Sequence, residues 1–396
     1  MADPNKGSGK NRSLLYLAGG DASEAAAQRA ASKAGVTAPV WLGRRGYAVA
    51  WVAQQADEEM PPRATIQARW DAGQGVVLPG FLASALAGCQ EDVVASKALV
   101  AKAQHGAEIA GLFDAEPYVS RLAPAFELLA SSVDEGDDQE IETLEFDVLK
   151  AGELVAEGLW VKASWLSFDD SDASLRFRFS FGMAGYEDVA ADFERQDYAA
   201  KLTEALFPES AMISASQPLD ALLQDVLGVD KVAYVERIIY FNAPNGGAQM
   251  HQDVERGHAG VVYAQVSGST VWLALSKTEL MAEIQSFMAR PDVDELLVSE
   301  LPEAPDRTTL KAWCATSERL AQMLDERDND PLEALINRVP AFARQLIEKG
   351  YGAILKPGDV MLLPQQSMEH CAWHSVYCVG DEAGEALSFA VRGAPL

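Results

Sequence analysis

The second half of the chain alternates short β-rich segments with turns, and one helical block of about 75 residues interrupts them. The segments carry the two-residue alternation of half-buried strands, as in Arg176-Phe-Arg-Phe179. Helical and β-rich stretches that are separate along the chain predict an α+β fold. The expected strands are residues 143–149, 158–168, 174–182, 232–241, 352–355, 359–363, 372–379 and 386–392.

The helical block has recognisable ends. Ser276-Lys-Thr-Glu279 is a capping box, which satisfies the free amides of a first helical turn. Gly350 is expected to stop the last helix, and Pro340 is expected to kink it. We therefore predict a helical insert at residues 276–350, between strands of the core.

The first 140 residues differ from the rest in the secondary structure that we expect of them. Residues 1–12 are expected to form a flexible tail, and residues 13–140 a mixed, mainly helical region with a strand at residues 65–70. An acidic run at residues 132–139, which we interpret as a solvated loop, lies at the predicted boundary. The second domain would then comprise residues 141–396.

Acidic side chains outnumber basic ones by 59 to 32, which gives a formal net charge of −27. This balance argues against nucleic-acid binding and against docking on an anionic membrane, because both need cationic side chains. It is compatible with a basic partner. The first residues lack the apolar stretch of a secretory signal, and the four cysteines show no CxxC spacing. We therefore expect a cytoplasmic protein with reduced thiols.

A His-x-Asp element, His251-Gln-Asp253, directly follows a predicted turn. In an extended chain, residues i and i+2 point to the same face, so both side chains can bind one metal ion. A histidine about 120 residues downstream is available as a third ligand. Two histidines and one carboxylate make up the facial triad of non-haem Fe(II) oxygenases, which leaves three coordination positions open.

Several short motifs, in a fixed order, carry a resemblance to a known family. They are His251-Gln-Asp253, Gln265-x-x-Gly268, Pro357-Gly-Asp359 with Pro364, Trp373-His374-Ser-Val376 and the terminal Ser388-Phe-Ala-Val-Arg-Gly-Ala-Pro395. On these motifs the chain resembles the JmjC and cupin-8-like Fe(II)/2-oxoglutarate-dependent oxygenases, over roughly residues 232–275 and 352–395. The resemblance implies a double-stranded β-helix (a jelly-roll or cupin core). It also implies Fe(II), and O2-dependent decarboxylation of 2-oxoglutarate coupled to substrate oxidation.

Two histidines compete for the distal ligand position. His370 lies six residues after Pro364, which is the commoner spacing in the family. His374 begins the Trp-His-Ser-Val strand and alternates with Ala372 and Val376. We favour His374 as the ligand and expect the other histidine close to the iron.

The anchor for the far carboxylate of 2-oxoglutarate departs from the family pattern. Many relatives place a lysine where this chain has Thr270. A carboxylate still needs a cationic partner, ideally a bidentate one. We predict Arg392 on the last strand as that partner, with added hydrogen bonds from the hydroxyl groups of Thr270 and Tyr240. The alternative for Arg392 is a surface residue at a strand end.

We predict a hydroxylase that acts on a C–H bond of an amino-acid, peptide or protein side chain. Its substrate would be a small molecule, a peptide or a basic protein. The alternatives are a cupin-type metalloenzyme that does not use 2-oxoglutarate and a non-catalytic JmjC-like binding scaffold. The helical insert is expected to be a lid over the iron or a homodimer interface.

Overall fold

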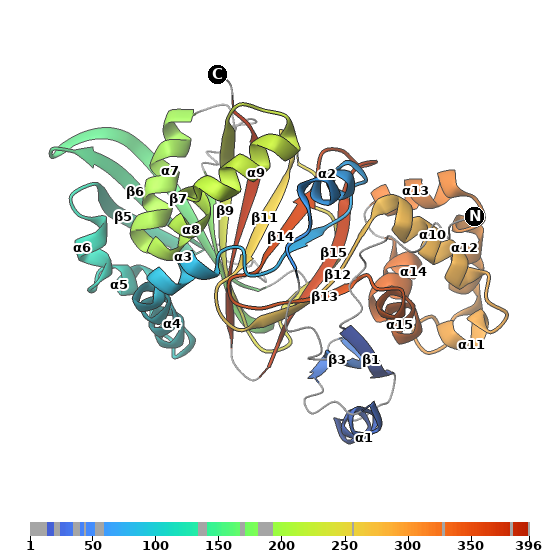
Figure 1. The fold of residues 1–396 in the computed structure, drawn as a ribbon. Coiled ribbons are helices and arrows are strands. Elements are labelled where there is room, and N and C mark those ends of the chain that lie inside the picture. The colour runs from blue at the N-terminus through green and yellow to red at the C-terminus, as the bar shows by residue number, and fades with distance from the viewer. Residues whose placement is uncertain are drawn as a thin grey trace.

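The computed structural model shows that both helices and antiparallel strands are abundant, which confirms the α+β class (Figure 1). It describes residues 14–19, 24–34, 40–42, 45–51, 59–133, 141–166, 171–180, 193–255, 257–326, 329–380 and 383–394.

Two antiparallel sheets form the centre of the molecule (Figure 1). The smaller sheet consists, in order, of β10 (Gly247–His251), β15 (Ala372–Val379), β12 (Ser269–Ser276) and β13 (Gly352–Leu355). The larger sheet consists, in order, of β4 (Val76–Leu78), β14 (Val360–Pro364), β11 (Gly260–Gln265), β16 (Gly384–Gly393), β9 (Val232–Asn242), β8 (Ser171–Ser180), β7 (Glu153–Leu166), β6 (Glu142–Lys150) and β5 (Phe126–Val133).

From β9 to β16 the chain passes repeatedly between the two sheets. The strands β9, β11, β14 and β16 belong to the larger sheet, and β10, β12, β13 and β15 belong to the smaller one. The inner faces meet in a compact apolar cluster that includes Tyr263, Trp272 and Leu355. This face-to-face packing leaves room for a pocket at one end of the strands.

Helices cover the outer face of the larger sheet (Figure 1). Phe177 on β8 and Phe241 on β9 pack against Phe207, which follows α7, with ring centroids of Phe177 and Phe207 5.0 Å apart. The helical segments of this layer are α2 (Arg63–Asp71), α3 (Ala83–Gly88), α4 (Gln90–Gln104), α5 (Ile109–Phe113), α6 (Tyr118–Leu122), α7 (Phe193–Leu206), η3 (Pro208–Ser210), α8 (Ala211–Ser214) and α9 (Gln217–Leu227).

The insert between β12 and β13 packs on the outer face of the smaller sheet. It consists of α10 (Lys277–Met288), α11 (Val293–Leu297), α12 (Ala304–Trp313), α13 (Ser317–Asp325), α14 (Asp330–Glu333), the π-helical turn η4 (Ala334–Arg338) and α15 (Pro340–Glu348). The predicted capping box of Ser276 and Glu279 is confirmed at the start of α10. Among the described residues, no helix combines the length and apolar character that crossing a membrane requires.

The N-terminal segment shares the core of the insert. A three-stranded sheet has the order β1 (Leu14–Gly19), β3 (Tyr47–Trp51) and β2 (Val40–Leu42), and α1 (Glu24–Ala34) connects β1 to β2. Leu14, Leu42 and Tyr47 are buried in the same cluster as Phe342 of α15 and Leu273 of β12. One apolar cluster therefore joins three parts of the chain that are far apart in sequence.

Two local predictions were wrong. Residues 65–70 form part of α2 instead of a strand, because Ile66 and Trp70 are buried four residues apart, which is the helical period. Pro340 does not kink a helix. It occupies the first position of α15, where its missing amide costs no hydrogen bond.

The predicted boundary near residue 140 lies between two paired strands. Phe126 of β5 is opposite Val148 of β6, so the larger sheet continues across this position. The division of the chain into domains stays a prediction.

Two carboxyl groups are buried together on the outer face of the larger sheet. Glu209 in η3 is 0% exposed and Glu385 in β16 is 1% exposed. The Ser96 hydroxyl donates a hydrogen bond to Glu209. Burial, together with the neighbouring Glu209 carboxyl group, raises the pKa of Glu385 well above its usual range.

This pair predicts a stability that falls with increasing pH. The folded protein retains a proton that the unfolded chain loses near the ordinary glutamate pKa of about 4.5. The stabilisation is therefore complete below that pH and is lost as the pH rises through the folded-state pKa. Glu385→Gln removes the linked proton. At pH 8 it should raise the Tm over wild type by an amount on the order of a few degrees, and by less at pH 5.

Thermal melts between pH 5 and pH 8 test this expectation. The matched control is Glu283→Gln, because the buried Glu283 accepts hydrogen bonds from Lys349 and Gln345. That variant should lose stability throughout the pH range. An unchanged difference in Tm between wild type and Glu385→Gln across the range would contradict the linkage.

Candidate metal centre

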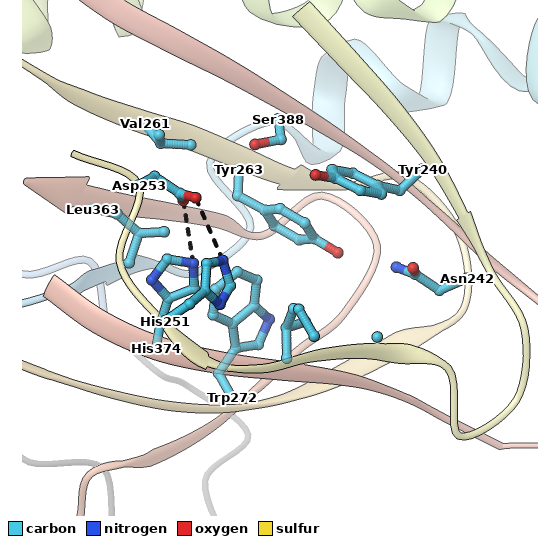
Figure 2. Close-up of a pocket in the computed structure, with 13 residues that line it drawn as sticks. Tyr240, Asn242, His251, Asp253, Val261, Tyr263, Trp272, Leu363, His374 and Ser388 are labelled. Carbon is cyan, nitrogen blue, oxygen red and sulfur yellow. Dashed lines mark ion pairs between the residues drawn. The ribbon is translucent and has the colours of Figure 1, made fainter. Parts of the chain in front are cut away.

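A pocket lies between the two sheets, at the end of β10 (Figure 2). Its volume is about 40 Å³. Strands of both sheets contribute to the lining, so the pocket depends on how the sheets face each other. The lining residues are Tyr240, Asn242, Gly247, Ala248, His251, Asp253, Val261, Tyr263, Trp272, Leu363, His374, Val376 and Ser388.

His251, Asp253 and His374 converge in this pocket. His251 ends β10 and lies opposite His374 on β15, with ring centroids 4.3 Å apart. The Nε2 atoms of His251 and His374 each lie 3.4 Å from an oxygen of Asp253 (dashed lines, Figure 2). Ligand atoms that share an ion at 2.0–2.2 Å are separated by roughly 3 Å, so this group can hold one metal ion.

Backbone carbonyl groups fix the orientation of both imidazole rings. Nδ1 of His251 lies 2.7 Å from the carbonyl oxygen of Gln249, and Nδ1 of His374 lies 3.1 Å from that of Ala372. Because a carbonyl oxygen only accepts hydrogen bonds, Nδ1 of each ring carries the proton. Each Nε2 then presents a lone pair toward Asp253, as metal-binding histidines require.

The electrostatics of the pocket suit a cation. Partial burial acts to raise the pKa of Asp253, but the adjacent His251 and His374 hold it well below its usual range. Burial lowers the pKa of His374, whose ring also stacks on Trp272 with centroids 5.5 Å apart. The site therefore offers an ionised carboxylate and a neutral imidazole, the protonation states that bind metals.

Of the two candidate distal ligands, His374 lies beside His251 and Asp253. His370 is exposed in the turn before β15, where its backbone amide donates to Ser367. It lies outside the group of converging ligands.

The three residues predicted to bind the cosubstrate differ in where they lie relative to the pocket. Tyr240 lines the pocket, and burial raises its pKa to about 12. Thr270 is 0% exposed and lies outside the lining. Its hydroxyl donates to Gln265 and accepts from Trp272, both at 2.8 Å. Arg392 does not line the pocket either, because it lies at the end of β16, opposite Ala233.

Sequence reasoning missed several lining residues. Asn242, Tyr263 and Ser388 place polar groups around the pocket, and the ring of Trp272 also belongs to the lining. Strand alternation was a usable signal for Tyr263 and Ser388. Once Gln265 is taken to face inward, Tyr263 two residues earlier faces inward as well.

A second group of possible metal ligands is already paired with a cationic side chain. Glu236, Glu255 and His258 bring ligand atoms within 4.8 Å of one another. However, Arg178 forms ion pairs with both Glu236 and Glu255. The arrangement is an ion-pair cluster, and His258 lies on the loop after Asp253.

Comparisons with known proteins add little to this geometry. No protein-family model matches the chain, and no curated protein matches its sequence. Among solved structures, the chain aligns with an oxidoreductase of the 2OG-Fe(II) oxygenase family from Burkholderia pseudomallei. The TM-score is 0.29 and the identity 11%, over 85% of this chain and 92% of that one. A likeness at this TM-score carries no argument, so the description of the site rests on its own residues.

The geometry predicts which histidine binds metal. Asp253→Ala and His374→Ala should each weaken Co(II) binding by more than the roughly 10–100-fold that loss of an outer partner costs, because each removes a direct ligand. His370→Ala is the matched control and should bind Co(II) like the wild type. Titration of the apoprotein, followed by the cobalt absorption spectrum, measures all three. Weakened binding in His370→Ala, with His374→Ala unaffected, would reverse the assignment.

Proposed function

We propose that the protein is a non-haem Fe(II) oxygenase that uses 2-oxoglutarate and O2. The observation that carries the proposal is the convergence of His251, Asp253 and His374. This donor set fits Fe(II), and three protein ligands leave coordination positions open toward the pocket. Iron, when bound there, would supply the activation of dioxygen.

We further propose that β9 to β16 form a double-stranded β-helix. The support is the division of these eight strands, four in each sheet, and the orders β14-β11-β16-β9 and β10-β15-β12-β13. In such an arrangement, the facing sheets hold ligands from β10 and β15 on one side of the interior. The aromatic rings of Trp272 and Tyr263, with centroids 4.6 Å apart, form an apolar part of the pocket wall.

Polar residues of the pocket lining support a site for the far carboxylate of 2-oxoglutarate. Tyr240, Asn242 and Ser388 offer hydrogen-bond donors there. Arg176 lies opposite Tyr240 across β8 and β9, and its charge acts to lower the pKa of the phenol. Neither Arg176 nor Arg392 lines the pocket itself. We propose Arg176 as the cationic partner, because it lies beside the lining residue Tyr240, whereas Arg392 lies at the strand end opposite Ala233.

Anaerobic addition of Fe(II) and then 2-oxoglutarate to the apoprotein tests the function. Chelation of the iron by the keto acid should produce a visible metal-to-ligand charge-transfer band in the wild type. His374→Ala serves as the control and should give no band. Iron binding without a band would remove 2-oxoglutarate from the proposal, and failure to bind iron would remove the metal centre.

Loss of the anchor should weaken cosubstrate binding specifically. Arg176→Met should raise the dissociation constant of 2-oxoglutarate roughly 10–100-fold, as expected for one hydrogen bond to a charged group. Iron affinity should be unchanged. Arg178→Met is the matched control on the same strand, because Arg178 pairs with Glu236. If Arg392→Met weakens binding and Arg176→Met does not, Arg392 is the anchor.

A cupin-type metalloenzyme that does not use 2-oxoglutarate is the second candidate. Two observations favour it. Among the described residues, no lysine or arginine lines the pocket, and its volume of about 40 Å³ has room for roughly three waters. Absence of the charge-transfer band together with tight iron binding would favour this reading.

We propose an amino-acid, peptide or protein side chain as the substrate. The net charge of −27 supports a basic substrate, because opposite charge speeds encounter.

A further inference from the structure

The strand that carries His251 contains an irregularity. Ala248 of β10 is opposite Val376 of β15, and His251 is opposite His374, so three steps along β10 match two steps along β15. One extra residue in one strand is a β-bulge. Bulges are common beside active sites, where they change the direction of a side chain.

This bulge decides which face of the sheet His251 occupies. In a regular strand, residues three apart point to opposite faces. Ala248 and His251 nevertheless both line the pocket, while Met250 packs into the cluster beneath the helical insert. If residues 248–251 formed a regular strand, the face that carries Ala248 would not carry His251.

The insert binds the backbone at this bulge. The amide of Met250 donates to Oδ1 of Asn337 at 2.8 Å. Asn337 belongs to the π-helical turn η4 and is 7% exposed. Because buried backbone donors need partners, this side chain stabilises the bulged backbone.

Arg45 holds Asn337 in place. Its Nη1 donates to the backbone oxygen and to Oδ1 of Asn337, each at 3.0 Å. The Arg45 guanidinium also lies 5.0 Å from the ring centroid of Tyr377 on β15, within cation–π range. One guanidinium group thus connects the N-terminal segment, the insert and the strand of His374.

We propose that Asn337 is a positioning residue for the metal centre, and that Arg45 supports it. Asn337 fixes the β10 bulge and thereby the direction of His251. The bulge also supplies the carbonyl group of Gln249, which accepts the Nδ1 proton of His251. The inference rests on the proposed function only in requiring that His251 binds a metal ion.

Co(II) titration of the apoprotein tests the proposal through the dissociation constant and the cobalt d–d spectrum, with the Tm as a measure of folding. Asn337→Leu removes both acceptor roles and should weaken Co(II) binding at least 10-fold with an altered spectrum. Asn337→Asp keeps an oxygen for Met250 and Arg45, so it should stay within about threefold of the wild type. Arg45→Met should weaken binding in the same direction as Asn337→Leu.

Asn329→Leu is the matched control. Asn329 lies in the same insert, is also 7% exposed, and donates to the carbonyl groups of Met323 and Glu326, which both belong to the insert. This variant should lower the Tm and leave the Co(II) affinity unchanged. A purely structural role for Asn337 would give Asn329→Leu and Asn337→Leu the same cobalt behaviour.

The outcomes separate this inference from the proposed function. If the wild type binds no Co(II), both fail together. If the wild type binds Co(II) and Asn337→Leu matches it in affinity and spectrum, the positioning role alone is overturned. The same conclusion follows if Asn337→Asp binds as weakly as Asn337→Leu. Should Asn337→Leu not fold, weaker binding by Arg45→Met with retention by Asn337→Asp supports the role, and any other result overturns it.

Discussion

The metal centre depends on the register of β10 against β15. Two imidazole rings on neighbouring strands can share an ion only when they lie opposite each other, as His251 and His374 do. Close approach of the strands needs a glycine. A Cβ on Gly247 would lie only 1.9 Å from the carbonyl oxygen of Val376. Packing on both faces of the smaller sheet, against the larger sheet inside and the insert outside, then holds this register.

The three side chains of the metal centre are already in position in the metal-free protein. Carbonyl groups of Gln249 and Ala372 set the tautomers, and Asp253 lies between the two Nε2 atoms. In the metal-free protein each Nε2 atom lies 3.4 Å from an oxygen of the carboxylate, so a cation can bind between the three groups without large movement. Preorganisation of this kind reduces the free energy spent on ordering ligands when the metal binds.

Strand alternation and motif order grouped His251, Asp253 and His374 from the sequence, and the structure brings these side chains together. The i, i+2 rule brought His251 and Asp253 together, and the alternation with Val376 favoured His374 over His370. The same reasoning does not decide Arg392, because alternation along a strand does not say how far along that strand the pocket extends. It failed for residues 65–70, where Ile66 and Trp70 satisfy the helical period as well as a strand pattern.

The contribution of the N-terminal segment and the insert was beyond sequence reasoning. Neither the bulge in β10 nor the bond from Met250 to Asn337 has a local signal, because both arise from contact between segments far apart in sequence. Arg45 illustrates the difficulty. Nothing near it in the chain indicates burial of a guanidinium group, which depends on Asn337 and Tyr377.

The point at which the insert joins the sheet has an evolutionary consequence. β12 and β13 are neighbours, with Leu273 opposite Gly352, so the insert leaves and returns at adjoining positions. A block gained at such a place disturbs no strand pairing and adds little loop-closure entropy. Because Asn337 accepts a hydrogen bond from the backbone amide of Met250, however, the core strand β10 now depends on the insert. Sheet and insert then have to be inherited together, and substitutions at Asn337 are constrained by a strand almost ninety residues earlier.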